Sequence, residues 1–273
     1  MARLSVNETT TFRWSFEEDV SHYAKGGIPS IGVWRHKLSD CGQTKAAELI
    51  RQSGLTVSHL FWAGGFTGSD GHTFLESIAD AADALRTASC LGARCLVLYS
   101  GARAGHTYNH ARRLVLDALK ELAPLASQLG VDLALEPMHP GCAAEFTFLT
   151  NLDETLAVLD AAGCPAVKVV LDTYHLGFDA ALIERIPEIT PRIALVQLGD
   201  GRSPPEGEQN RCRLGQGIIP LKRIVAALSG AGYDGYYDVE LLGEEFGEPD
   251  YLALLAHAKQ AFEELLGRQL CWS

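Results

Sequence analysis

The chain has 273 residues, of which 47% are hydrophobic and 21% charged, a composition typical of globular proteins with a sizeable core. Its formal net charge of −11 disfavours binding to a nucleic acid, whose phosphate backbone carries charge of the same sign. The polar start MARLSVNETTTF lacks a signal-peptide pattern, and no apolar run reaches the roughly 20 residues of a membrane span. We therefore expect a cytoplasmic protein without a membrane partner.

Short apolar runs alternate with segments of helical period along the whole chain. The runs predict eight β-strands, at residues 3–8, 28–34, 55–62, 94–101, 131–138, 167–175, 193–200 and 236–243. The segments predict a helix after each strand, at residues 16–26, 43–54, 73–92, 109–130, 152–163, 179–187, 221–232 and 250–267. Several of them end in glycine, which readily adopts the left-handed conformation that follows a helix.

Eight strand–helix units in this length fit a single (β/α)8 TIM barrel, a fold of about 250 residues. We predict one such domain over residues 1–273. The alternative, an open doubly wound sheet, usually carries a GxGxxG sequence after its first strand. No such sequence follows residues 3–8, and RLGQGIIP, late in the chain, contains only GxG.

Polar residues end four of the predicted strands, at the positions where a TIM barrel carries its chemistry. They are Glu136 in LALEP, Asp172 in VVLDTYH, Gln197 in LVQLGD and Glu240 in YDVELLG. Each alone is also compatible with a structural role, such as capping a loop. Together, three carboxylates at one mouth would repel one another unless a cation compensates them. An oxygen-rich set with an open position suits Mg²⁺ or Mn²⁺, and Zn²⁺ and Co²⁺ also occupy such sites.

These motifs resemble the xylose isomerase-like TIM barrels, a family of sugar isomerases, epimerases and related enzymes. The likeness covers nearly the whole chain and rests on the order and spacing of LALEP, LDTYH, LVQLGD, RCRLGQGIIPL and GYDGYYDVEL. It implies one divalent metal ion (Mn, Mg, Zn or Co) held by Glu136, Asp172, Gln197 and Glu240. Many members of the family have histidine where this chain has Gln197, whereas the hydroxypyruvate isomerase branch has glutamine.

The resemblance further implies that His175 and Arg211 contact the oxygens of the substrate. His139 either joins them or orders the turn in EPMHP. Trp34, Trp62 and His106 are expected in the wall of the pocket. Asp200 is expected to hold Arg202 or a loop amide. Homodimers and tetramers are common in the family, so a homo-oligomer is possible.

The implied function is a metal-dependent isomerase or epimerase of a sugar, sugar phosphate or small ketose. In this scheme Glu136 and Glu240 flank the substrate as opposed acid and base and act through a metal-stabilised cis-enediolate. Elimination from the same enediolate would make the protein an inosose-type dehydratase.

Two further alternatives are a barrel that binds a polyol or sugar acid without catalysis, and an abasic-site endonuclease. The endonucleases of this fold hold three zinc ions with several extra histidines. Nucleic-acid binding also favours a basic face, so the acidic charge of this chain disfavours that alternative.

Overall fold

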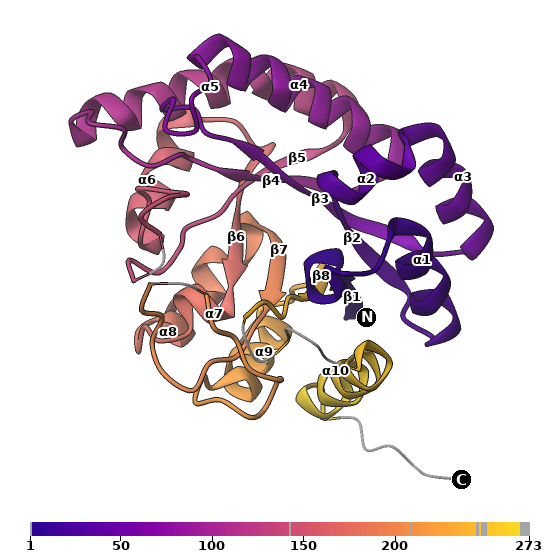
Figure 1. Cartoon of the computed structure of the whole chain (residues 1–273). Helices are drawn as coiled ribbons and strands as arrows, with labels where there is room; N and C mark the ends of the chain where they lie inside the picture. The colour runs from indigo at the N-terminus through magenta and orange to yellow at the C-terminus, as the bar shows by residue number, and fades with distance from the viewer. Residues whose placement is uncertain (1, 142, 208, 244–245, 247–249, 268–273) are drawn as a thin grey trace, which may run out of the picture.

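The structure, a computed structural model, describes residues 2–141, 143–207, 209–243, 246 and 250–267. In these residues eight parallel strands form one closed barrel in chain order (Figure 1). Strand β1 pairs with both β2 and β8, which closes the ring. The predicted (β/α)8 barrel is therefore confirmed. The strands are β1 (Arg3–Asn7), β2 (Ser30–Trp34), β3 (Thr56–Gly64), β4 (Cys95–Tyr99), β5 (Asp132–Leu135), β6 (Val167–Asp172), β7 (Ile193–Leu198) and β8 (Tyr236–Val239).

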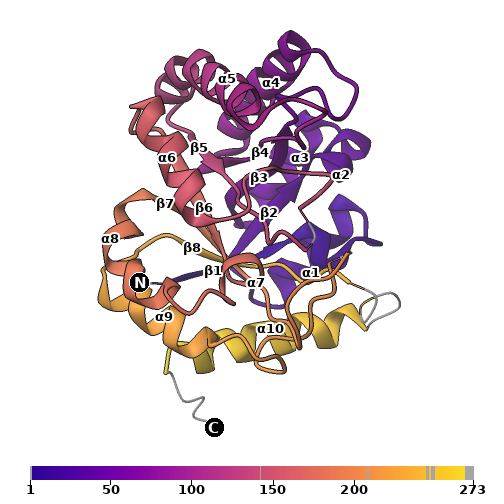
Figure 2. The same ribbon diagram turned by 90° about the vertical axis from the view of Figure 1, so that its left-hand side faces the viewer.

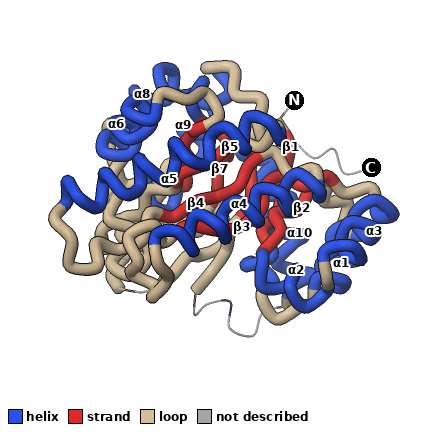
Figure 3. Tube along the Cα trace, turned by 90° about the horizontal axis from the view of Figure 1, so that it is seen from above, coloured by secondary structure: helices blue, strands red, loops and turns tan. Residues whose placement is uncertain are grey.

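Helices surround the strands, as the view from above shows with helices in blue around strands in red (Figure 3). They are α1 (Phe16–Lys25), α2 (Arg35–Cys41), α3 (Gln43–Ser53), α4 (Phe74–Leu91), α5 (Tyr108–Leu129), α6 (Leu152–Ala162), α7 (Thr173–Leu176), α8 (Leu182–Ile189), α9 (Leu221–Gly230) and α10 (Tyr251–Leu265). Each of the eight predicted helical segments contains a helix. Two short helices, α2 and α7, were not predicted, because so few residues show no clear period. No helix of the described residues is long and apolar enough to cross a membrane.

Local sequence signals fix many helix ends. Helices α1 and α4 begin with capping boxes, formed by Ser15 with Glu18 and by Thr73 with Glu76. The glycines that follow α3, α4, α5 and α6 adopt the left-handed conformation, with φ between 62° and 75°. The prediction that glycines end these helices is confirmed.

The strand ends differ from the prediction in a way that matters for the site. The predicted strand 167–175 is too long, because β6 ends at Asp172 and the next four residues form α7. The side chain of Asp172 accepts a hydrogen bond from the Tyr174 N–H at 2.6 Å and so caps this short helix. Strands β5 and β8 also end early, so Glu136 and Glu240 each lie one residue beyond a strand.

Apolar side chains form two clusters. The larger one lies between the strands and the helices. The smaller one comes from strand residues that fill the inside of the barrel: Phe61, Cys95, Val97, Ala134, Val170, Leu195 and Tyr236. Helices α4 and α5 cover one side of the barrel, and α10 covers the opposite side (Figure 2). The rings of Trp14 and Tyr251 meet edge to face at 5.1 Å, which ties the first loop to α10.

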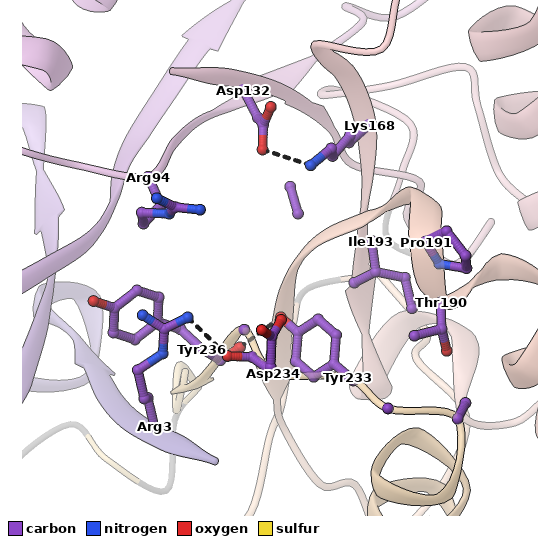
Figure 4. A pocket seen from close by; sticks show the side chains of 14 residues that line it. Arg3, Arg94, Asp132, Lys168, Thr190, Pro191, Ile193, Tyr233, Asp234 and Tyr236 are labelled. Atoms are coloured by element: carbon purple, nitrogen blue, oxygen red, sulfur yellow. Dashed lines mark hydrogen bonds and ion pairs between the residues drawn. The ribbon is translucent and has the colours of Figure 1, made fainter. Parts of the chain in front are cut away.

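The mouth at which the strands begin contains a hollow of about 290 Å³ (Figure 4). Lys168 Nζ lies 2.9 Å from Asp132 Oδ2 there, and Arg3 Nη2 donates to the carbonyl of Asp234 at 2.7 Å. Residues at this end of a TIM barrel contribute to stability, whereas reactions take place at the other end. The active site is therefore expected at the mouth where the strands end.

Candidate active site

The four polar residues predicted at strand ends lie together at the C-terminal mouth of the barrel. Asp172 and Gln197 are paired across β6 and β7, and Gln197 is paired with Asp238, two residues before Glu240. Glu136 follows β5, the other neighbour of β6. All four predicted residues are at most 3% exposed. Closure of the barrel thus gathers residues that are distant in the sequence into one buried cluster.

Arg211 extends its guanidinium group into this cluster. Its Nη2 lies 2.9 Å from Asp172 Oδ2 and 3.4 Å from Glu240 Oε1, and its Nη1 lies 3.3 Å from Asp172 Oδ1. Gln209 Oε1 accepts a hydrogen bond from Nη2 at 2.9 Å, and the guanidinium stacks over the ring of Tyr174 at 4.6 Å. Because it bonds both oxygens of Asp172, the guanidinium is held in a fixed orientation.

A hydrogen bond to Glu240 determines the orientation of the Gln197 amide. Its Nε2 donates a hydrogen bond to Glu240 Oε2. The carbonyl oxygen of the amide, Oε1, therefore points elsewhere, and it accepts no hydrogen bond from the described residues. Glu136 Oε2 is buried in the same way, again without a donor in the described part of the chain. Buried oxygens without donors are rare in folded proteins and indicate a missing partner.

Burial is the largest influence on the titration of the carboxyl groups. It raises the pKa of Glu136 well above the ordinary value, and the charges of Glu240 and Asp172 add to this effect. Burial also raises the pKa of Glu240, to about 7, although Arg211 lowers it. For Asp172, burial opposes ionisation, but Arg211 and His175 keep its pKa below the ordinary value. Without a metal ion, these effects favour the ionised form of Asp172 and the protonated form of Glu136, and they bring the midpoint of Glu240 to about pH 7.

The two histidines predicted to bind substrate lie in different surroundings. His175, in α7, is buried, with Nε2 3.9 Å from Glu136 Oε1 and 4.0 Å from Asp172 Oδ2. Burial lowers its pKa to about 4, so the ring is neutral at pH 7. His139 accepts a hydrogen bond from the Gly141 N–H at 3.1 Å in its own loop. This contact is the one expected of a residue that orders the turn.

A cavity of about 310 Å³ opens above Glu136 and Glu240. Its remaining lining is largely aromatic or apolar: Phe12, Trp34, Phe61, Trp62, Met138, Phe146 and Leu242, with Thr9, His36 and Gln209. The expected wall residues Trp34 and Trp62 are among them, whereas His106 packs against His110 at the start of α5. Phe146 and Gln209 were not predicted, because they come from irregular loops where no period indicates which side chains point inward.

The loop that carries Arg211 is organised by Asp200. The carboxylate of Asp200 accepts hydrogen bonds from the backbone N–H groups of Gly201, Gly215, Gly217 and Ile219, at 2.9 to 3.3 Å. The expectation that Asp200 holds loop amides is therefore confirmed. This loop places Arg211 and Gln209 over the end of β6.

The donor set fits a divalent cation. One ligand atom each from Glu136, Asp172 and His175 lie within 4.8 Å of one another. His175, predicted as a substrate contact, is thus also placed as a candidate ligand. Three ionised carboxylates with one guanidinium leave two negative charges, which one divalent ion balances. The free oxygens of Glu136 and Gln197 supply further donors.

The fold is that of a known group of proteins. The chain belongs to the xylose isomerase-like TIM barrel family, whose model matches residues 24–265. It is 23% identical to an inosose isomerase of Bacillus velezensis over 97% of this chain and 98% of that protein. It is 27% identical to a putative hydroxypyruvate isomerase of Streptomyces coelicolor, with 80% and 82% of the two chains covered.

Solved structures show the same fold. A protein of Sinorhizobium meliloti 1021 superposes with a TM-score of 0.89 at 29% identity, covering 96% of this chain and 98% of that one. The IOLI protein, solved with a bound zinc atom, superposes with a TM-score of 0.82 at 22% identity, covering 99% and 100%.

Proposed function

We propose that this chain is a divalent-metal-dependent isomerase or epimerase of a small sugar or ketose, with Glu136 and Glu240 as opposed acid and base. The observation that carries the proposal is a pair of buried glutamates, one directly after β5 and one directly after β8, that line one cavity beside an arginine. The names of the related isomerases support the same class of reaction.

The titration of the two glutamates suits proton transfer in both directions. An acid with a pKa near the working pH can both accept and release a proton, and the pKa of Glu240 is about 7. The pKa of Glu136 is also raised, first by burial and then by the charges of Glu240 and Asp172, which favours the acidic form of that residue. Glu240 would remove the proton from the carbon beside the substrate carbonyl, and Glu136 would return one.

The fate of that proton decides the product. Return to the same carbon from the opposite face gives an epimer, and return to the neighbouring carbon gives an aldose–ketose isomer. The proton removal leaves an enediolate, and the positive charge of Arg211, which lies beside Glu240, would stabilise its negative oxygens.

The candidate ligands of the metal remain the predicted Glu136, Asp172, Gln197 and Glu240. Of these, Glu136 and Asp172 lie in one group of possible donors with His175, which adds a fifth candidate. A divalent ion held there would supply Lewis-acid stabilisation of the carbonyl oxygen. The zinc atom of the related IOLI structure supports the presence of a metal.

The proposal is tested by exchange of protons with solvent. Ketoses, ketose phosphates, inososes and hydroxypyruvate are incubated in D2O with the protein and Mn²⁺, Co²⁺ or Zn²⁺, and deuterium beside the carbonyl is measured by NMR. We expect metal-dependent exchange with at least one of these classes, lost on chelation. A binding protein without catalysis would exchange none, and loss of a hydroxyl would indicate a dehydratase.

Variants of the two glutamates then test their roles. We expect Glu136→Gln and Glu240→Gln to slow exchange by about 10²-fold to 10⁴-fold, the usual contribution of general acid–base catalysis. Asp132→Asn is the matched control, because Asp132 begins β5 at the opposite mouth, whereas Glu136 directly follows the end of that strand. Wild-type rates in both glutamine variants would rule out the two-glutamate scheme.

A further inference from the structure

A buried polar chain lies beneath the proposed acid and base, and it starts at Asn7, the last residue of β1. Asn7 is fully buried and caps the 3-10 helix η1 (Glu8–Thr11). Its Oδ1 accepts hydrogen bonds from the N–H of Thr9 at 3.0 Å and from Thr9 Oγ1 at 2.9 Å. Because a backbone N–H can only donate, the orientation of the amide is fixed, and the NH2 group faces the barrel interior.

Two acceptors lie within hydrogen-bond distance of this NH2 group, which also interacts with the carboxyl group of Asp238. Asn7 Nδ2 lies 3.5 Å from Glu240 Oε2 and 3.3 Å from His59 Nε2. His59 must therefore present a lone pair at Nε2 and carry its proton on Nδ1. Burial lowers the pKa of His59 to about 3, which agrees with a neutral ring.

The other ring nitrogen of His59, Nδ1, also has a hydrogen-bond partner. Its Nδ1 lies 2.9 Å from Ser58 Oγ, which in turn lies 2.7 Å from Ser5 Oγ and donates to the carbonyl of Ile31 at 3.2 Å. A methyl group at Gly32 would come within 2.3 Å of His59 Cε1, so only glycine leaves room for the ring in this position. The chain from Ser5 to Asn7 thus has one consistent set of donors and acceptors.

We propose that Asn7 is a positioning residue, which with His59 behind it fixes the orientation of the Glu240 carboxylate. Glu240 Oε2 then lies between two amides, one from β7 and one from β1, while Oε1 faces Arg211. A carboxylate held in this way cannot rotate freely, so both of its oxygens keep a defined direction towards a metal ion and a substrate. This inference rests on the proposed function for its meaning, but the geometry can be tested without a substrate.

The test compares Asn7→Ser with Ser30→Ala. Serine is a good helix cap, so Asn7→Ser keeps the acceptor for Thr9 and loses only the NH2 group that reaches Glu240 and His59. Ser30→Ala is the control, because Ser30 is a buried hydroxyl on the neighbouring strand that contacts Thr56 and lies at the other end of the barrel. Thermal unfolding of the metal-free proteins checks that both variants fold.

The first measurement is the ¹⁵N spectrum of the His59 ring, assigned from the signal lost in His59→Gln. We expect the Nδ1–H tautomer in the wild type and in Ser30→Ala, and a displaced Nε2 signal in Asn7→Ser. An Nε2–H tautomer or a charged ring in the wild type at pH 7 overturns the proposal, because neither can accept a hydrogen bond from Asn7.

The second measurement is the affinity for Co²⁺, followed in the visible spectrum. Loss of a residue that supports a ligand usually weakens metal binding by about 10-fold to 100-fold, and we expect such a loss in Asn7→Ser but not in Ser30→Ala. Equal affinities of Asn7→Ser and the wild type overturn the positioning role and leave the proposed function intact. A wild type that binds no Co²⁺ contradicts the proposed function instead, and the tautomer of His59 then decides the Asn7 proposal.

Discussion

At the scale of single residues, neighbouring groups fix the two amides at the site. Gln197 donates to Glu240 and keeps its own oxygen free, and Asn7 accepts from Thr9 and turns its NH2 group inward. A histidine in place of Gln197 would offer a ring nitrogen as ligand instead of an oxygen. The glutamine is therefore compatible with a working metal site.

Substitutions at Gln197 test whether its oxygen is a ligand. We expect Gln197→His to bind Zn²⁺ as tightly as the wild type or more tightly, because imidazole is a good zinc ligand. Gln197→Ala removes the ligand and the donor to Glu240, and we expect about 10-fold weaker binding or worse. Competition with a chromophoric chelator measures both constants. Three equal affinities would show that Gln197 is not a ligand.

Asp238 gives a prediction of pH dependence. Burial raises its pKa well above the ordinary value, and Ser5 and Asn7 only partly oppose this. The unfolded chain releases that proton at lower pH than the folded protein does. Asp238 therefore destabilises the folded protein progressively as the pH rises above about 4, the ordinary pKa of an aspartate.

We expect Asp238→Asn to unfold at a higher temperature than the wild type at pH 7.5, with the difference vanishing near pH 4. Asp132→Asn, which removes a carboxylate paired with Lys168, should show no such gain. A stability difference between Asp238→Asn and the wild type that does not vary with pH would contradict a raised pKa of Asp238.

At the scale of elements, the candidate metal ligands lie at the ends of strands, and the loops supply the other residues of the site. Glu136, Asp172, Gln197 and Glu240 lie at or just beyond strand ends. The long loop after β7 brings Arg211 and Gln209 back over them, and the four amides bound by Asp200 give that loop its shape.

Removal of the Asp200 side chain should therefore loosen this loop. We expect Asp200→Ala to cost about 2 kcal/mol or more in the free energy of unfolding, because it leaves four backbone N–H groups without their acceptor, those of Gly201 and Ile219 being buried. Hydrogen exchange should accelerate first at Gly215, Gly217 and Ile219. Asp179→Ala, which removes one exposed turn contact to Ala181, should change stability by less than about 0.5 kcal/mol. Unchanged protection in Asp200→Ala would contradict this account of the loop.

At the scale of the whole molecule, charge and barrel closure determine what the chain can bind. The net charge of −11 opposes association with a phosphate backbone. In the described residues, one group of three candidate ligands lies close together, and it contains a single histidine. A three-zinc site needs several histidines. We therefore expect no cleavage of an abasic-site DNA duplex in the presence of Zn²⁺ at 0.15 M salt. An established abasic endonuclease serves as positive control, and Zn²⁺-dependent cleavage lost in Glu136→Gln would contradict this prediction.

The sequence by itself determined the order of the strands and helices, because strand runs, helical period and capping residues are local signals. It also determined which polar residues end the strands, and the spacing of LALEP, LDTYH, LVQLGD and YDVELLG indicated the family. It did not determine the short helix α7 or the end of β6, which depend on the capping hydrogen bond of Asp172.

Only the tertiary structure decided which side chains meet. The contacts of Asn7 with His59 and Glu240, and of Arg211 with Asp172, join residues that are far apart in the sequence and carry no mutual pattern. They arise because closure of the barrel sets the register of β1 against β8 and of β6 against β7. The loops that carry Phe146 and Gln209 have no period, so their contribution to the cavity also follows from the fold alone.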